Sequence, residues 1–307
     1  MLAPVGLLKA CSVVSAKLNY PRLSIFLVAP SREFKSQTSV EMTRIFSKNR
    51  YLDLGSDFTI HSLHGRYRER GMDRKCLMIN DATLLFASKK ANTKDRLVNA
   101  LAELLSESKY VYGDRVNPKL TIEARISVIM NMTLESYNKY QSTLIGSTFL
   151  ERFLTLFYSM PEEELTEFAR KRDERMSMKF GNILSLRNIS VVKVNKNYKK
   201  VLIDYAKEFS VLSVKSFNSC NDTVNAIVKS HAILNNRDYV CDDDIEILKI
   251  TEKFLSNPFA PNESKIIKFY KQGKTYTDIC NLLGRDEGYK SYISRVIKKA
   301  KERGVVN

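Results

Sequence analysis

The chain has 307 residues, of which 44% are hydrophobic and 27% are charged, and this balance excludes a disordered chain, a collagen-like repeat and a fibrous architecture. Its 50 Lys and Arg residues outnumber its 34 Asp and Glu residues, which gives a formal net charge of +16. We therefore expect a folded protein of two or three domains whose partner is a polyanion.

The cysteines and histidines do not indicate a metal site. The five cysteines include no CxxC pair, and three histidines cannot complete a zinc set with them. We expect reduced thiols in a cytoplasmic protein. No apolar run reaches the roughly 18 residues of a membrane span, and the apolar stretch at 1–18 is expected to be a helix rather than a signal.

The first section of the chain alternates strands with helices. Short apolar runs predict strands, and amphipathic spacing predicts helices. The expected strands are 23–29, 75–80, 124–131 and part of 151–158, and the expected helices include 36–48, 94–108 and 223–236. We predict an α/β core with a parallel sheet at 1–160, a mostly helical section at 161–258 and a separate basic module at 259–307.

The segment that follows the first strand has the context of a phosphate-binding loop, because it joins a buried strand to a helix. Its residues are Ala29, Pro30, Ser31, Arg32, Glu33, Phe34, Lys35 and Ser36. In the pattern GxxxxGKS/T, Lys35 supplies a cation to the phosphates and Ser36 a hydroxyl to Mg²⁺. Both glycines are replaced, by Ala29 and Phe34, and a side chain at the second position hinders the approach of a phosphate.

Asn80 and Asp81 follow the second strand, where nucleotide sites carry acidic residues that organise Mg²⁺ and polarise water. Two alignments are possible. In one, Asn80 takes the metal-organising position and Asp81 is the catalytic carboxylate; in the other, Asp81 is the metal ligand and there is no base. A single Asp at the end of a strand is also a common helix cap or turn residue.

Two further polar residues complete this order of motifs: Asn131 at the end of VIMN (128–131) and Arg152 in TFLERF (148–153). In chain order, these motifs resemble those of the AAA+ ATPases, in particular the branch of the MCM helicases and MoxR proteins. The resemblance covers most of residues 20–255 and implies an ATP- and Mg²⁺-dependent homo-oligomer with a helical lid at 161–258. It further implies that Asn131 orients the attacking water and that Arg152 reaches the γ-phosphate of the neighbouring subunit.

The segment 110–125 reads as a β-hairpin, because two β-prone stretches surround Gly113-Asp114 and Asn117-Pro118. In the MCM branch the corresponding hairpin contacts DNA in a central channel. By that resemblance, Arg115 and Lys119 near the turn are candidate DNA contacts. Basic residues at a hairpin tip are also commonly just solvated.

The last 49 residues carry a net charge of +6, and three helical segments at 263–272, 275–284 and 287–303 are joined by short turns with Gly273 and Gly284. This is a helix-turn-helix arrangement that resembles the winged-helix domains fused behind AAA+ lids. The third segment puts polar and basic residues on the face opposite its apolar one. These candidate DNA contacts are Ser291, Arg295, Lys298 and Lys299.

These patterns favour a DNA-associated AAA+ ATPase that acts as a replication initiator or helicase-like factor. The alternative is a DNA-binding or scaffold protein that keeps the fold without catalysis, since the two glycines are replaced, Asn80 is neutral and no Arg precedes the lid helix near Lys215. A third reading is a MoxR-like chaperone that acts on proteins.

Overall fold

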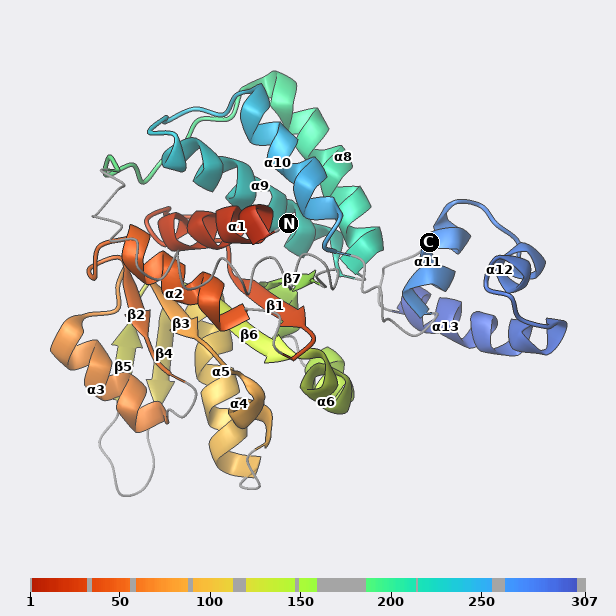
Figure 1. The fold of residues 1–307 in the computed structure, drawn as a ribbon, viewed down its shortest axis with the longest axis horizontal. Coiled ribbons are helices and arrows are strands. Elements are labelled where there is room, and N and C mark those ends of the chain that lie inside the picture. The colour runs from red at the N-terminus through yellow and green to blue at the C-terminus, as the bar shows by residue number, and fades with distance from the viewer. Residues whose placement is uncertain are drawn as a thin grey trace, which may run out of the picture.

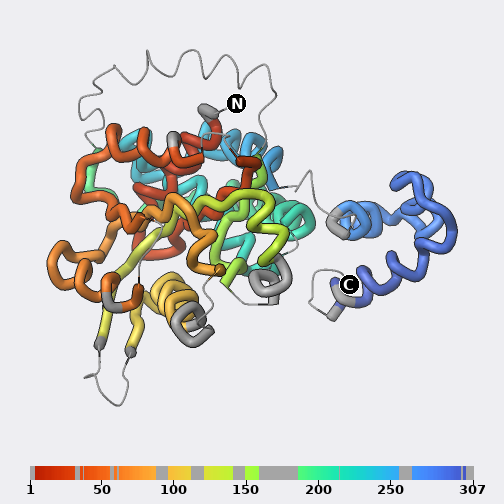
Figure 2. Tube along the Cα trace, turned by 60° about the horizontal axis from the view of Figure 1, so that its bottom comes forward, coloured from red at the N-terminus to blue at the C-terminus, as the bar shows by residue number. Residues whose placement is uncertain are grey.

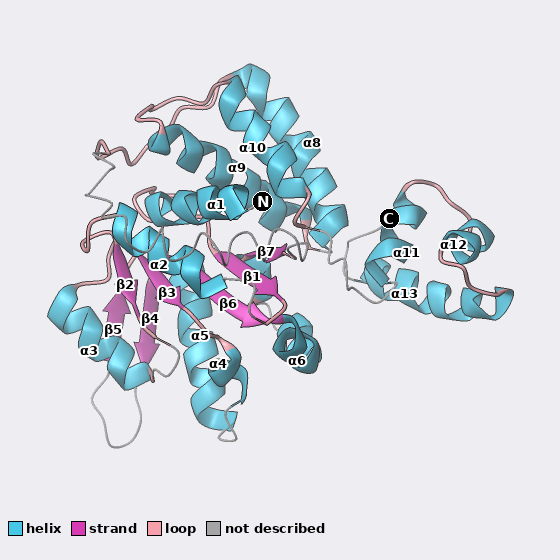
Figure 3. Cartoon of the chain, in the orientation of Figure 1, coloured by secondary structure: helices cyan, strands magenta, loops and turns pink. Residues whose placement is uncertain are grey.

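The computed structural model describes residues 2–31, 35–55, 59–87, 91–112, 120–146, 149–158, 186–213, 215–255 and 263–302. Strands form a central layer between helices (Figure 3). The described part of the chain confirms the predicted α/β class, with a five-stranded parallel sheet.

The sheet has the strand order β2-β3-β6-β1-β7. Its strands are β1 (Ile25–Ala29), β2 (Tyr51–Asp53), β3 (Lys75–Ile79), β6 (Ile126–Thr133) and β7 (Leu154–Phe157). The inner strands are buried on both faces, as a parallel sheet covered by helices requires. The apolar runs of β1, β3 and β6 predicted these strands correctly. The strand expected within 151–158 is β7.

Helices cover both faces of the sheet (Figure 1). One core includes Ile25 and Leu27 of β1 with residues of α1 (Leu2–Ser15), α2 (Lys35–Ile45) and α9 (Phe217–Leu234). The other core includes Phe26 and Val28 with residues of helices from the opposite face. Those helices are α3 (Ile60–Arg70), α4 (Thr83–Ala87), α5 (Ala91–Glu107) and α6 (Leu134–Gly146). Alternate side chains of β1 thus enter different cores, which is the period of two expected of a strand.

The predicted hairpin is confirmed at its base. Strands β4 (Lys109–Tyr112) and β5 (Leu120–Glu123) pair antiparallel, and the Nζ of Lys109 lies 2.7 Å from Oε1 of Glu123. The candidate DNA contacts Arg115 and Lys119 lie outside the described residues.

The middle section is helical where it is described, as predicted. It contains α8 (Lys196–Ser213), α9 and α10 (Asp242–Glu252), and α9 packs against both α8 and α1. A buried carboxylate, Asp244, fixes the turn between α9 and α10, because its Oδ1 lies 2.7 Å from Nδ1 of His231 and 2.9 Å from Nη2 of Arg237. Pairing is necessary here because an isolated buried carboxylate is unstable.

The C-terminal residues form three helices with a core of their own, as predicted. They are α11 (Glu263–Lys271), α12 (Tyr276–Leu282) and α13 (Lys290–Glu302), and the core includes Ile266, Ile279 and Ile293. Thr275 begins α12 with a capping box, since Thr275 Oγ1 accepts a hydrogen bond from the Asp278 amide and the Asp278 carboxylate accepts one from the Thr275 amide. In both views these helices lie to one side of the molecule, and α11 contacts α8 (Figures 1 and 2).

Candidate functional site

The carboxyl ends of β1, β3 and β6 meet at one edge of the sheet, because the strands are parallel and adjacent in register. From β1 the chain runs through α2 to β2 on one side, whereas from β6 it runs through α6 to β7 on the other side. Adjacent strands whose connections leave in opposite directions form a topological switch point. Crevices at such points are the usual ligand sites of open α/β sheets.

Lys35 lies at this edge as the first residue of α2. Its Nζ donates hydrogen bonds to the carbonyl oxygens of Ala29, at 3.0 Å, and of Pro30, so the side chain lies over the beginning of its own loop. Ser36 is exposed at the same helix start, and Ser31 is exposed in the loop. An amine beside the amino end of an eleven-residue helix provides two sources of positive potential for an anion. The remaining loop residues, Arg32, Glu33 and Phe34, lie outside the described residues.

Asn131 is buried in β6, and its side chain is held by a lysine of α1. Lys9 is also fully buried, and its Nζ donates to Asn131 Oδ1 at 3.0 Å. The same amine donates to the Lys35 carbonyl oxygen at 3.0 Å, to Thr38 Oγ1 at 2.7 Å and to Ser39 Oγ at 2.9 Å. Lys9 therefore links α1, the start of α2 and β6 at the point where the candidate phosphate loop ends.

The environment of Lys9 disfavours its charged form. Burial is the main cause that lowers its pKa to about 7, and the nearby charge of Lys35 acts in the same direction. The Asn131 amide nitrogen donates to Ser39 Oγ at 3.1 Å, so both ends of this amide are engaged within the network. Sequence reasoning missed Lys9. The available signal was a single cation within the apolar stretch 2–16.

Asp81 and Asn80 have different environments at the end of β3. The Oδ1 of Asp81 accepts a hydrogen bond from the Thr83 amide at 2.9 Å and fixes the turn into α4, which is the capping role that the sequence left open. Asn80 Oδ1 is buried and has no hydrogen-bond partner among the described residues. A buried acceptor without a partner is unusual in a folded protein. Asn80 Oδ1 is therefore an acceptor that a ligand at this edge could use.

These groups fit a magnesium ion that arrives with phosphate. Among the described residues, no group of three or more His, Cys, Asp or Glu side chains could hold a metal ion. Asn80, Asp81 and Ser36 nevertheless offer oxygen atoms, which are the ligands Mg²⁺ prefers. Mg²⁺ is commonly held by one or two protein groups together with substrate phosphates.

Arg152 lies at the opposite edge of the sheet, because it ends the 3₁₀ turn η1 (Leu150–Arg152) just before β7 begins. Its Nε donates to Ser106 Oγ near the end of α5. The structure therefore brings Lys35, Asn80 and Asn131 to one edge and keeps Arg152 of the same chain apart from them.

Lys215, the cation nearest the start of α9, also lies at the Arg152 turn. Its buried Nζ donates to the carbonyl oxygens of Leu150, at 2.7 Å, and of Phe153. Burial lowers the pKa of Lys215 to about 8. The hydroxyl of Ser216 lies 3.2 Å from Oε2 of Glu151 in the same turn. The start of α9 is thus attached to the segment that carries Arg152, not to the edge with Lys35.

The C-terminal helix α13 has one apolar and one basic face. Ile293, Val296, Ile297 and Ala300 are buried in the module's core, as predicted. Ser291, Arg295 and Lys298 are exposed on the other side; Lys299 lies on the same helix. The Arg295 guanidinium lies 6.0 Å from the centre of the Tyr292 ring. An exposed row of cations on a helix matches the footprint of a phosphate-binding surface.

Models of known protein families give no match to this chain, and no curated protein matches it significantly. Within the described residues, no helix is long and apolar enough to cross a membrane.

Proposed function

We propose that the protein is a DNA-associated ATPase of the AAA+ type. The observation that carries this proposal is the meeting of Lys35, Asn80 and Asn131 at the switch point of a parallel sheet. These residues come from three separate segments of the chain, and they meet where open α/β sheets bind ligands.

Four groups at this edge have a role in binding and cleaving a nucleoside triphosphate. When bound, ATP with Mg²⁺ supplies the phosphoanhydride that water cleaves. Lys35 and the amino end of α2 neutralise phosphate oxygens, and Ser36 offers a hydroxyl to the metal ion. The free Oδ1 of Asn80 accepts a hydrogen bond from a water molecule there, and Asp81 supplies a carboxylate.

Arg152 acts on the neighbouring subunit in this proposal. Because it lies at the opposite edge from Lys35, it cannot complete the site of its own chain, and a head-to-tail assembly is required. An arginine supplied in trans stabilises the charge of the transition state and is worth roughly 10³–10⁵ in rate. The protein is therefore expected to be a homo-oligomer with sites between subunits.

DNA is the proposed substrate of the assembly. The basic face of α13 supports this assignment, together with the net charge of +16. By resemblance, the β4–β5 hairpin adds a second contact through its tip. We propose that α11–α13 act as a winged helix and that α8–α10 act as the lid.

The structure also favours a second candidate, an AAA+-fold DNA-binding protein without hydrolysis. Asp81 is engaged in a turn, Asn131 is engaged by Lys9, and Lys215 is attached to the Arg152 turn. Because of these contacts, the three side chains are already engaged within the protein and are not free to act on a nucleotide. The two candidates differ in one measurable property, which is ATP turnover.

The decisive experiment mixes two inactive variants. Lys35→Ala and Arg152→Ala are each expected to abolish DNA-stimulated ATP hydrolysis, and mixed oligomers are expected to recover part of it, because some interfaces then carry both intact residues. Arg68→Ala, which removes an exposed arginine of α3, is the matched control and should keep full activity. The absence of ATP turnover in the wild-type protein, with DNA binding intact, would support the second candidate. Activity that persists in both variants would refute the ATPase proposal.

A further inference from the structure

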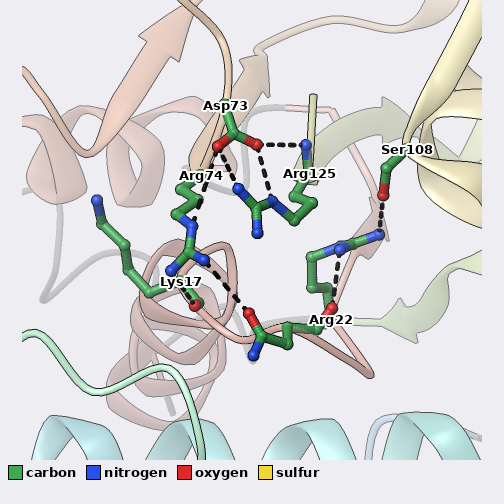
Figure 4. Close-up of polar contacts among 7 residues, drawn as sticks. Lys17, Arg22, Asp73, Arg74, Ser108 and Arg125 are labelled. Atoms are coloured by element: carbon green, nitrogen blue, oxygen red, sulfur yellow. Dashed lines mark hydrogen bonds and ion pairs between the residues drawn. The ribbon is translucent and has the colours of Figure 1, made fainter. Parts of the chain in front are cut away.

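Four cations gather at the amino edge of the sheet, where β1, β3 and β6 begin (Figure 4). They are Lys17 after α1, Arg22 before β1, Arg74 before β3 and Arg125 before β6. We call these four residues, with Asp73, the basic edge cluster. Asp73 is the carboxylate within it, so the cluster has three uncompensated positive charges.

The carboxylate of Asp73 accepts three hydrogen bonds from one of these cations, Arg125. Its Oδ1 and Oδ2 accept hydrogen bonds from Nε of Arg125 at 3.1 Å and from Nη2 at 2.7 Å, and its Oδ1 also accepts from the Arg125 amide at 2.8 Å. Arg74 Nε lies farther away, at 3.9 Å from Oδ2. A bidentate carboxylate of this kind satisfies one guanidinium, so Asp73 offsets mainly the charge of Arg125 and has only the longer contact with Arg74.

Two of the other cations, Arg22 and Lys17, have only neutral partners or none among the described residues. Arg22 donates through Nη2 to Ser108 Oγ at 2.8 Å and through Nη1 to the Asn19 carbonyl oxygen at 3.1 Å, but its Nε is buried with no partner among the described residues. The Lys17 amine makes no hydrogen bond or ion pair with the described residues (Figure 4). These two side chains therefore carry unused donors.

Burial, and secondarily the neighbouring cations, disfavour the charged forms of Lys17 and Arg22. Burial and then the charges of Arg50 and Arg74 lower the pKa of Lys17. Burial and then Arg125 lower the pKa of Arg22. Like charges held this close destabilise the folded chain unless an anion offsets them.

The cluster is separate from the candidate nucleotide site, because it lies at the opposite ends of the same parallel strands. It adjoins the base of the β4–β5 hairpin: Ser108, which holds Arg22, directly precedes β4, and Arg125 follows β5. An anion bound here would lie beside the hairpin that the proposed function assigns to DNA.

We propose that the basic edge cluster binds successive phosphates of a DNA backbone. The assignment rests on the proposed association with DNA and adds a surface that the C-terminal module does not include. Cations from three separate loops gather at one edge of the sheet, as repeated phosphates require, and guanidinium groups match the geometry of phosphate oxygens. Contacts of this kind fix the position of DNA without reading its sequence.

The test measures DNA affinity by fluorescence anisotropy across a salt series. Lys17→Gln removes a charge without leaving a hydrogen-bond partner unsatisfied, and it should make the slope of log K against log salt shallower by about 1. Over a tenfold rise in salt, the affinity of the variant should therefore fall roughly eightfold less than that of wild type, with the variant the weaker binder at low salt. Lys200→Gln removes an exposed charge of α8 and is the matched control, with an unchanged slope expected.

A second variant guards against a merely structural effect. Asp73→Asn removes the negative charge of the cluster, so it should tighten DNA binding and steepen the salt slope even if it lowers the stability of the turn. A structural role alone predicts equal or weaker binding for Asp73→Asn, and that result would overturn the proposal.

The remaining outcomes separate this proposal from the proposed function. If Arg295→Gln weakens DNA binding while Lys17→Gln and Asp73→Asn leave it unchanged, the cluster assignment fails alone. If the wild-type chain binds no DNA, both the cluster assignment and the proposed association with DNA are wrong. If Lys17→Gln weakens the binding of inorganic phosphate but leaves the affinity for DNA and its salt slope unchanged, the cluster is a site for free phosphate and the DNA assignment is overturned.

Discussion

The network around Lys9 makes the stability of the protein depend on pH in a defined direction. The pKa of Lys9 falls from an ordinary value of 10.5 to about 7 in the folded state, mainly because the side chain is buried. Between these pH values the unfolded chain binds more protons than the folded chain, so stability must rise with pH. At 1.36 kcal/mol per pKa unit, the rise that Lys9 contributes is about 5 kcal/mol.

The substitution Lys9→Met isolates this contribution, because methionine fills a similar volume without an amine. It leaves the Oδ1 of Asn131 without its partner, which costs roughly 1–3 kcal/mol at any pH. Near pH 7 the variant should be the more stable protein, since it avoids the larger cost of a buried ammonium. Near pH 10.5 the wild type should be the more stable.

Urea unfolding of both proteins from pH 6 to pH 10.5 measures the effect as a difference between two curves. Lys215, whose pKa is lowered to about 8, contributes equally to both and cancels. Lys200→Met, at an exposed position of α8, should follow the wild-type curve. Parallel curves for Lys9→Met and wild type would refute the reasoning, because the amine would then have the same pKa in the folded and unfolded chain.

Three further predictions follow from single side chains. Asn80→Ala removes a buried acceptor without a partner, so it should weaken Mg²⁺-dependent ATP binding, measured by calorimetry, without lowering the free energy of unfolding. Thr275→Ala removes the cap of α12 and should cost about 1 kcal/mol in urea unfolding of the full chain, whereas Thr275→Ser should retain the stability. Ile293→Ala leaves a cavity in the core of α11–α13 and should cost about 2–5 kcal/mol and reduce DNA binding, while ATP binding stays unchanged; a loss of both activities together would contradict the separation of the module.

The sequence determined those elements whose signal is local. The apolar runs of β1, β3 and β6, the periodicity of α5 and the capping box at Thr275 each depend on neighbours within a few residues. Elements with a weak local signal were missed. Strand β2 has only three residues, and α3 is rich in Arg and His, so neither has a long apolar pattern.

Only the tertiary structure decided what the candidate site residues contact. Lys9 and Asn131 are 122 positions apart in sequence, and the four cations of the basic edge cluster span residues 17 to 125. Such contacts depend on the order of the strands in the sheet and on the edge that each loop reaches. Local patterns in a single sequence predict neither of these two properties. Composition could indicate a polyanionic partner, but only the parallel sheet separates Lys35 from the basic edge cluster, because its strands begin and end at opposite edges. Lys35 lies at the candidate nucleotide site, and the basic edge cluster lies at the base of the hairpin.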